Sequence, residues 1–424
     1  MKITSSNIAA ARAEASTAPV DAALRERARR VVPGGMWGHL NAAALPSGYP
    51  QFFARSEGCH LWDVDGREYV DLMCSWGPIL LGHHHRGVDD AYARQAALGA
   101  CMNGPAPVMV ELAEQLVGQI AHADWALFQK NGTDATTTCV TVARAGTGRR
   151  KILVARGAYH GAVPWCSPSL VGVTSEDRAH LIYFDYNDVE SVKAAVQQAE
   201  GDLAAILVSA FRHDLGRDQE APTLAFAQAV RAAATAADAA LIVDDVRAGF
   251  RLHPGGSWET VGVRPDLSAF SKSIANGYPL AAVTGNDRFR EAASKLYVTG
   301  SFWCEAPPMV AALVTQRTLV AEQAIAHMVA MGQRLRDGLA TLARQSGIGL
   351  RQSGPVQMPM VLFDDDADGH KGRTFCNAAL SAGAYFHPRH NMFLSAAHQP
   401  EDIDRALSAA AAGFEALARA RPGH

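Results

Sequence analysis

Short apolar runs and longer amphipathic stretches alternate through the middle of the chain. The apolar runs predict strands buried in a sheet, at residues 125–129, 151–155, 204–208 and 241–246. Between them, apolar residues at helical spacing predict helices, one ending near residue 145, one over 188–199 and one over 221–237. This alternation is typical of a mostly parallel sheet with helices on both faces.

The flanking regions predict other elements. Residues 1 to about 20 are rich in Ala and Ser and predict a loosely held arm, and a helix over 21–32 ends at Pro33-Gly34-Gly35. An alternating pattern between residues 51 and 72 predicts a hairpin with Asp65-Gly66 as its turn. Further helices are predicted over 89–99 and 107–120, from 307 to about 345, and over 401–420.

These elements divide the chain into three parts. Over residues 1–80 we expect an N-terminal arm, a helix and a hairpin. Residues 81–306 form a large sheet domain, and residues 307–424 form a separate C-terminal α+β domain. A chain of 424 residues is long enough for one large domain and a smaller one.

Composition and charge narrow the class of protein. The chain is 48% hydrophobic and 19% charged, and its net charge of −3 includes no basic block, so nucleic acid is not an expected partner. No apolar run suits a membrane span, and no signal peptide is recognised. The seven cysteines are scattered without a CxxC pair, so we expect neither a disulfide framework nor a zinc site, and a cytoplasmic setting. Adjacent side chains point in different directions, so His83-His84-His85 predicts no metal site either.

A carboxylate and a lysine stand at the ends of two predicted strands. Asp244 ends the apolar run Leu241-Ile-Val243, and Lys272 follows the short apolar run Leu267–Phe270. Pyridoxal phosphate (PLP) needs a lysine for its Schiff base and an acid that keeps its ring nitrogen protonated. The alternative for Asp244 is a helix cap or a surface ion pair, but a buried carboxylate requires a cationic partner, and a protonated pyridine would be one.

Two further strand ends offer groups that suit the same cofactor. Asn131-Gly132-Thr133 joins a strand to a helix, and free N–H groups at a helix N-terminus favour a phosphate. The alternative is a simple helix cap. Tyr159 stands in the loop after another strand, where it could stack on a flat heteroaromatic ring or be an ordinary half-buried tyrosine.

The order of these motifs resembles the class III aminotransferases of PLP fold type I, and within them the glutamate-1-semialdehyde aminomutase-like branch. The resemblance runs from Val32 to His398. It implies an α/β fold, with residues 81–306 as a large PLP-binding domain whose mostly parallel sheet is flanked by helices. It also implies a smaller α+β domain built from the N-terminal segment and the C-terminus. The motifs that carry it are Asn131–Ala135, Tyr159–Gly161, Asp244–Arg251, Ser271-Lys272 and Gly300–Phe302.

The resemblance implies a role for each matching residue. Lys272 would form the internal aldimine and shuttle protons, Asp244 would bind the pyridinium nitrogen, and Tyr159 would stack on the ring. Ser301, at the family's usual threonine, would bind the phosphate in the other subunit, which implies a homodimer with active sites at the subunit interface. The remaining residues implied to bind the cofactor are Asn131, Gly132, Thr133 and His160.

The sequence departs from the family beside the cofactor. Ser209-Ala210 replaces the family's usual Glu-Pro at a strand end, and Phe211-Arg-His-Asp214 follows in place of a more usual Gly-Asn ending. Asp214 or His213 is therefore a candidate for the polar contact with the ring hydroxyl.

A second departure concerns the substrate. Relatives often carry an arginine shortly after Pro-Gly-Gly to hold a carboxylate, and residues 36–41 contain none here. Arg389, with Arg212 behind it, is a candidate replacement, and a solvated arginine is the alternative for each. The tryptophans expected near the pocket favour a hydrophobic or aromatic amine as substrate, although a tryptophan is more often part of a core. They are Trp37, Trp76, Trp165 and Trp303.

These features predict a PLP-dependent aminotransferase that moves an amino group from an amine or amino acid to a keto acid. An aminomutase or a racemase is the alternative, because the same lysine and ring serve those reactions. A PLP-binding regulator or a catalytically silent relative is a third class. The first 30 residues are too short for a DNA-binding appendage, and the presence of Lys272 and Asp244 argues against a silent protein.

Overall fold

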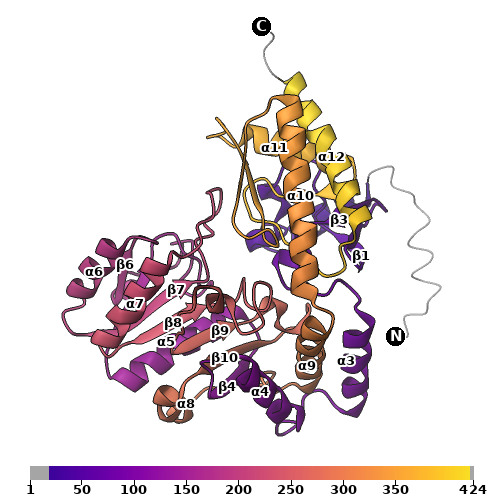
Figure 1. The fold of residues 1–424 in the computed structure, drawn as a ribbon. Coiled ribbons are helices and arrows are strands. Elements are labelled where there is room, and N and C mark those ends of the chain that lie inside the picture. Colours follow the sequence, from indigo (N-terminus) through magenta and orange to yellow (C-terminus); the bar gives the residue numbers. More distant parts are fainter. Residues whose placement is uncertain (1–18, 421–424) are drawn as a thin grey trace.

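The computed structural model describes residues 19–420, and these form a large α/β domain with a smaller α+β domain above it (Figure 1). The arm expected over residues 1 to about 20 lies almost entirely outside the described residues. Among residues 19–420, no helix has both the length and the apolar character that crossing a membrane would require.

A seven-stranded sheet forms the centre of the large domain. Strand β10 is antiparallel to both of its neighbours, and the other pairs are parallel, so the prediction of a mostly parallel α/β sheet is confirmed. The strands lie in the order β4 (Trp125–Gln129), β10 (Ala281–Gly285), β9 (Leu267–Phe270), β8 (Ala240–Asp244), β7 (Leu203–Ser209), β5 (Lys151–Ala155) and β6 (Leu181–Phe184).

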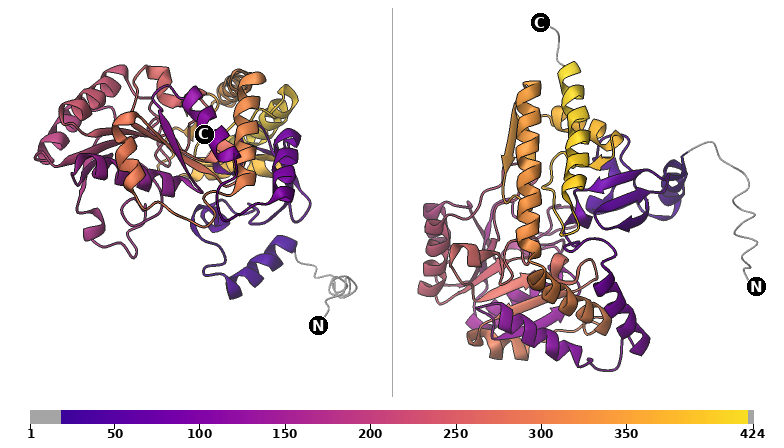
Figure 2. Two further views of the ribbon diagram at one scale, coloured as in Figure 1. Left: turned by 90° about the horizontal axis from the view of Figure 1, so that it is seen from below. Right: turned by 45° about the vertical axis from the view of Figure 1, so that its right-hand side comes forward.

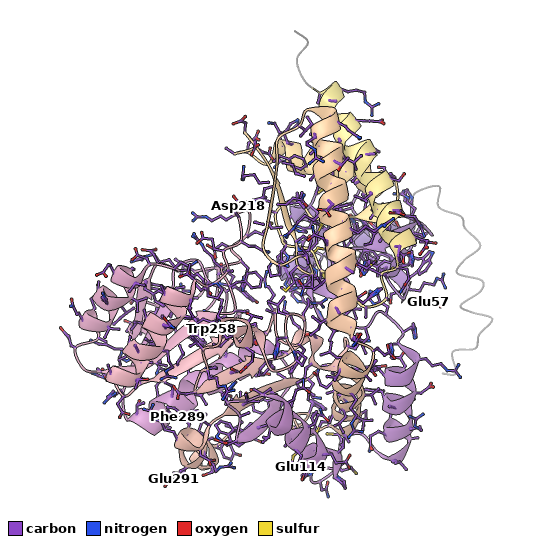
Figure 3. The ribbon with its side chains drawn as sticks, viewed as in Figure 1. Glu57, Glu114, Asp218, Trp258, Phe289 and Glu291 are labelled. Carbon is purple, nitrogen blue, oxygen red and sulfur yellow. The ribbon has the colours of Figure 1, made fainter. Side chains whose placement is uncertain are left out.

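Helices cover both faces of this sheet. In β7 every residue is buried, and alternate side chains serve opposite faces. Leu207 packs with helix α5 (Gly132–Thr147), while Ile206 and Val208 pack with α6 (Val189–Gln198) and α7 (Leu224–Ala236). The side chains are drawn in Figure 3. Trp258 and Phe289 are buried within the large domain, whereas Glu114 and Glu291 lie on its surface. The short helix α8 (Arg290–Lys295) follows β10.

The small domain combines both ends of the chain. Its four-stranded sheet has the order β1-β2-β3-β13, and β13 from the C-terminal region pairs in parallel with β3. The hairpin predicted between residues 51 and 72 is instead three strands: Asp65-Gly66 turns between β2 and β3, and a second turn at Gly58 joins β1 to β2. These elements are β1 (Phe53–Glu57), β2 (His60–Asp63), β3 (Glu68–Asp71) and β13 (Ala384–Tyr385).

Helices pack beside this sheet. Helix α2 (Val20–Val31) begins one residue before the predicted start at Asp21, and Asp21 accepts hydrogen bonds from the backbone of Gln51 and Phe52 at 2.9 Å each. The other elements of the small domain are β11 (Leu350–Ser353), β12 (Met360–Phe363), α11 (His370–Ser381) and α12 (Pro400–Arg419).

The helical stretch predicted from residue 307 to about 345 is divided into two helices. Two helices, α9 (Ala306–Ala321) and α10 (Ala324–Ser346), meet at Gln323, whose φ of +50° is left-handed and cannot continue a helix. Helix α9 packs against α3 (Arg86–Leu98) and α4 (Val108–Gln119) of the large domain, while α10 rises into the small domain (Figure 2). We therefore propose the domain boundary at Gln323 in place of residues 306 and 307.

Candidate active site

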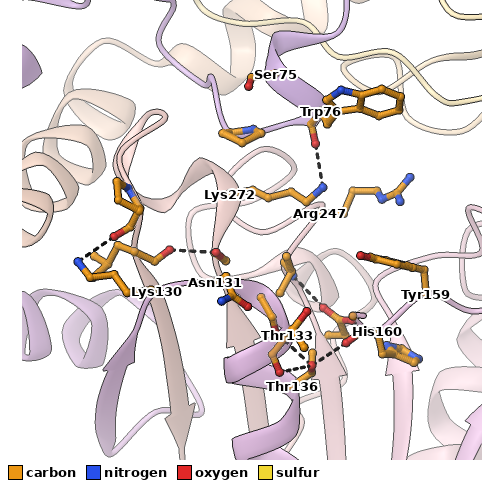
Figure 4. Close-up of a pocket in the computed structure, with 18 of the residues that line it drawn as sticks. Ser75, Trp76, Lys130, Asn131, Thr133, Thr136, Tyr159, His160, Arg247 and Lys272 are labelled. Carbon is orange, nitrogen blue, oxygen red and sulfur yellow. Dashed lines mark hydrogen bonds and ion pairs between the residues drawn. The ribbon is translucent and has the colours of Figure 1, made fainter. Parts of the chain in front are cut away.

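A cavity of about 380 Å³ lies at the carboxyl ends of the central strands (Figure 4). The strand register brings Asp244 directly beside Ser209 on β7 and Ala269 on β9. Parallel strands that end together present their last side chains at one edge of the sheet, where open α/β folds bind ligands. Of the predicted site residues, those that line the cavity are Trp76, Asn131, Gly132, Thr133, Tyr159, His160, Asp244 and Lys272, together with His213.

At the N-terminus of α5, within the described residues, one backbone amide is capped by a side chain and two others are free. Asn131 and Asp134 form a capping box, in which the Asn131 side chain accepts from the Asp134 amide at 3.1 Å. The amides of Gly132 and Thr133 have no hydrogen-bond partner within residues 19–420. A side chain at Gly132 would lie 2.6 Å from Val246 Cγ1, so glycine lets this turn pack closely against Val246. Two free amides at a helix N-terminus suit a phosphate.

Asp244 is held by hydrogen bonds at the end of β8. His160 Nδ1 lies 2.7 Å from Asp244 Oδ2, and the Val246 amide donates to Oδ1 at 3.1 Å. His160 is itself fixed, because its backbone carbonyl accepts from the Thr136 hydroxyl at 2.7 Å. Tyr159, next in the chain, remains 40% exposed and lines the cavity, which leaves its ring free to stack on a ligand.

Lys272 reaches across the cavity to a turn from the N-terminal region. Its Nζ donates to the Trp76 carbonyl at 2.8 Å (Figure 4). Burial, followed by the positive charge of Arg247, lowers the pKa of Lys272 to about 7. The backbone is left-handed both at Lys272, with φ of +44°, and at Trp76, with φ of +66°. Such conformations are costly and concentrate at functional sites.

Arg247 was not predicted as a site residue, yet it lines the cavity near Lys272, Tyr159 and Asp244. Its Nη1 donates to Asn391 Oδ1 at 2.7 Å and lies 2.9 Å from His390 Nε2. Sequence contained one signal, because the arginine follows a buried carboxylate at a strand end. Its partners come from the C-terminal region, which no local pattern connects to it.

Other predicted residues do not line this cavity. Ser301 is exposed, and its carbonyl accepts from the Cys101 thiol at 3.0 Å. Asp214 pairs with Arg212 at 3.0 Å, so His213 is the one of the two ring-hydroxyl candidates that reaches the cavity. The Ser209 hydroxyl is buried without a partner among residues 19–420.

The expected substrate residues are mostly elsewhere as well. Trp37 is 65% exposed, Trp303 stands in the loop with Ser301, and Trp165 lines a neighbouring cavity and donates to the Thr137 hydroxyl at 3.1 Å. Arg389 is exposed. Arg212 is occupied by Asp214 and by Glu220, at 2.7 Å from the latter, so neither arginine offers a free guanidinium to the cavity.

The histidine triplet divides among separate carboxylates. His83 Nε2 lies 2.8 Å from Asp71, and His84 Nδ1 lies 2.8 Å from Asp89. The two side chains therefore serve different parts of the fold.

The donor set of the cavity fits PLP. Free amides at the α5 N-terminus suit its phosphate, Asp244 suits its ring nitrogen, and Lys272, which with a pKa of about 7 is uncharged in about half of the molecules at pH 7, suits its carbonyl carbon. Each group belongs to a different element, and the ends of the sheet bring them together.

Comparison with known proteins agrees with this geometry. The chain is 46% identical over 93% of its length to an aminopentol aminotransferase of Sphingopyxis macrogoltabida, covering 94% of that protein. It is 31% identical to a glutamate-1-semialdehyde 2,1-aminomutase of Chloroherpeton thalassium, over 92% of this chain and 96% of that protein. The structure superposes with a TM-score of 0.93 on the PLP internal aldimine form of the FumI protein of Sphingopyxis sp. MTA144, at 46% identity, covering 94% of this chain and 96% of that one.

A family model, aminotransferase class-III, matches residues 44–407. The predictions of family, fold and PLP as cofactor are thereby confirmed. The chain belongs to the class III aminotransferases, PLP-dependent enzymes of fold type I.

Proposed function

We propose that the protein transfers an amino group from a hydrophobic or aromatic amine to a keto acid. The amine carbon exchanges its nitrogen and one hydrogen for oxygen and becomes a carbonyl. The keto acid carbon exchanges its oxygen for nitrogen and hydrogen and becomes an amino acid, so the two halves balance. When bound, PLP supplies a carbonyl carbon that takes the nitrogen and a ring that stabilises negative charge at the reacting carbon.

The residues of the chain would divide the remaining work. Lys272 Nζ, with a pKa of about 7, can take a proton from the substrate carbon and return it elsewhere near neutral pH. Asp244, oriented by His160, would keep a proton on the ring nitrogen. The Gly132 and Thr133 amides would hold the phosphate, and Tyr159 would cover the ring. The observation that carries this proposal is that Lys272 and Asp244 line one cavity.

The walls of the cavity support a donor whose side group is apolar. Trp76, Pro78 and Leu280 contribute apolar surface, and the His39 ring meets Trp76 edge-on at 4.9 Å. Burial, together with the charge of Lys272, lowers the pKa of His39, so its ring is neutral at pH 7. The relative at 46% identity is named for an aminopentol, a name that describes an amine with hydroxyl groups, and neutral imidazoles can bond hydroxyl groups.

We propose a homodimer, in the expected cytoplasmic setting, whose interface covers the loop around Ser301. Tyr297 is 95% exposed and Phe302 is 64% exposed, so this loop presents apolar rings to solvent. A second copy of the chain would cover these rings and place Ser301 beside the phosphate of the PLP bound in that copy. Light scattering should give twice the mass of one chain, and a monomer with bound PLP and full activity would contradict this proposal.

The proposed reaction is tested by measuring ketone formation from one amine in the presence and in the absence of a keto acid. Purified protein with PLP receives 1-phenylethylamine, with or without pyruvate. An aminotransferase makes about one ketone per active site without pyruvate, and many with it. Repeated turnover of a single amine without an acceptor would favour the aminomutase or racemase alternative. No ketone in either condition with a panel of amines would favour a regulator or a silent relative. Lys272→Ala should abolish both product and the visible absorption of the bound cofactor.

A further inference from the structure

Within residues 19–420, Arg247 is a buried cation in the cavity that forms no direct ion pair, although the charges of Asp244 and Asp214 act on it from a distance. Among the described residues, the lysine and arginine side chains that line the cavity are Lys130, Arg247 and Lys272. Lys130 is neutralised by Glu305 at 2.8 Å, and Lys272 has its assigned place at the cofactor. Within residues 19–420, no carboxylate forms an ion pair with Arg247.

Neutral groups orient this guanidinium. His390 Nδ1 bonds to the Asn391 carbonyl at 2.6 Å, so Nδ1 carries the proton and Nε2 accepts from Arg247 Nη1 at 2.9 Å. The Asn391 amide donates to the Met392 carbonyl at 3.0 Å, which leaves Oδ1 to accept from the same Nη1. Both contacts use Nη1, and Nε and Nη2 have no hydrogen-bond partner in the described part of the chain.

Burial makes this arrangement costly without an anion. It lowers the pKa of Arg247 to about 10 even though the nearby Asp244, Tyr159 and Asp214 raise it, and this value still leaves the side chain charged at neutral pH. A guanidinium edge that is held in place and has two free nitrogens matches a carboxylate, which accepts two parallel hydrogen bonds.

The position of Arg247 favours a substrate over the cofactor phosphate. In Figure 4, Lys130 and Asn131 lie on one side of Lys272, and Arg247 lies on the other, near Tyr159. The free amides at Gly132 already suit the phosphate. The simple amine that we propose as donor has no carboxylate, whereas the keto acid must have one.

We propose that Arg247 binds the carboxylate of the keto acid, and of the amino acid formed from it, and that His390 and Asn391 position the guanidinium. The proposal rests on the proposed aminotransferase function. Arg247 thereby takes the place that sequence assigned to Arg389 or Arg212.

The kinetic test compares two acceptors in Arg247→Met and Arg247→Lys. Pyruvate has the carboxylate, and propanal lacks it. The ratio of kcat/KM for pyruvate to that for propanal should fall about 30-fold or more in Arg247→Met, the size expected for one lost charged pair, and less in Arg247→Lys. The ratio removes any common effect of the altered Lys272 pKa. The control Arg264→Met replaces an exposed arginine outside the cavity and should keep the ratio of the unchanged protein.

A binding test needs no turnover. Propanoate, an unreactive carboxylate, should bind the PLP-loaded protein in calorimetry, and Arg247→Met should lose that binding. Asn391→Asp should lose it too, because the new carboxylate would pair with Arg247 while the arginine remains. Propanoate binding that persists in both variants would overturn the proposal.

Failure of the Arg247 proposal can be distinguished from failure of the proposed aminotransferase function. If Arg247 instead bonds the ring hydroxyl of PLP, Arg247→Met will shift the visible absorption maximum and leave the acceptor ratio unchanged, which overturns the proposal. If the unchanged protein transfers no amino group at all, the proposed function fails, and propanoate binding still decides whether Arg247 receives a carboxylate.

Discussion

His160 Nδ1 lies 2.7 Å from Asp244 Oδ2, and both side chains are buried. Beside a carboxylate, Nδ1 is the ring nitrogen that carries the proton. The histidine therefore fixes the rotation of the Asp244 carboxylate, while the Val246 amide holds its other oxygen at 3.1 Å. A ring nitrogen of PLP would meet an acid that is already oriented, which reduces the cost of binding.

The first prediction concerns this pair. His160→Ala leaves a buried carboxylate oxygen without its donor, at about 1–3 kcal/mol, so PLP should bind roughly 5- to 150-fold more weakly. Asp244→Asn should weaken PLP binding and also slow turnover at saturating cofactor, because the amide does not stabilise a protonated ring nitrogen. Titration of the cofactor-free proteins with PLP measures both.

His370→Ala is a matched control for this experiment, since His370 is exposed at the start of α11 and far along the chain from the cavity. Unchanged PLP affinity in His160→Ala would show that Asp244 keeps its orientation without the histidine.

The second prediction concerns pH. Only the neutral amine of Lys272 attacks a carbonyl, and its pKa is about 7, so the rate of PLP capture should rise with pH through about 7. Arg247→Met removes the positive charge that, after burial, lowers this pKa, so the rise should move to higher pH. Stopped-flow absorbance measures the rate. The same PLP solution serves both proteins, so ionisation of the cofactor cancels, and coincident profiles would contradict the role of Arg247.

The third prediction concerns the stability of the cofactor-free protein, and it follows from the lowered pKa of Lys272. Because the pKa of Lys272 is about 7 in the folded protein and 10.5 ordinarily, the unfolded chain binds more protons between these values. The free energy of unfolding therefore rises with pH between about 7 and 10.5. Below pH 7 the protein bears the full cost of burying the charged Lys272. Lys272→Met should raise the melting temperature at pH 6.5, with a gain that shrinks toward pH 10. A gain independent of pH would indicate a packing effect.

The fourth prediction concerns the close packing at Gly132. A methyl group there would lie 2.6 Å from Val246 Cγ1, so Gly132→Ala should destabilise the protein by about 1–3 kcal/mol and weaken PLP binding. Gly132→Ala with Val246→Ala should recover part of that loss, because the clashing methyl groups are removed. Denaturant unfolding of the single and double variants gives the coupling energy. If the two substitutions change the free energy of unfolding additively, the turn accommodates the new methyl group without a clash against Val246.

The groups that we propose for the cofactor could be read from sequence because each is tied to its local element. Asp244 ends an apolar strand, Lys272 follows another, and Gly132 begins a helix, so chemistry and position are readable together. The break at Gln323 was not readable, because glutamine is a good helix former and only its left-handed backbone ends the helix.

The residues that we propose for the substrate were harder to predict because they depend on contacts between distant segments. Arg247 is oriented by His390 and Asn391, and no periodic pattern links those positions. Arg389 was favoured instead, yet it is exposed. A tryptophan near a motif in sequence need not face the site, as Trp165 shows by lining a neighbouring cavity.

The last prediction concerns Arg251, which is fully buried and joins three segments. Its Nη2 donates to the carbonyls of Gly77 at 2.9 Å and Ile79 at 2.8 Å, and its Nη1 donates to the carbonyl of Leu394. Burial lowers its pKa to about 10, so it remains charged at neutral pH. Arg251→Met removes these donors and leaves the buried carbonyls unpaired, which should cost about 3–5 kcal/mol.

Because Gly77 follows Trp76, the turn that accepts from Lys272 should loosen as well. Urea unfolding should therefore show a large loss of stability in Arg251→Met and a smaller one in Arg251→Lys, which keeps a donor but cannot reach every carbonyl at once. Arg264→Met, at an exposed position, should stay within about 0.5 kcal/mol of the unchanged protein. An Arg251→Met protein as stable as this control would mean that water or other donors satisfy the carbonyls, and that Arg251 does not hold the Trp76 turn.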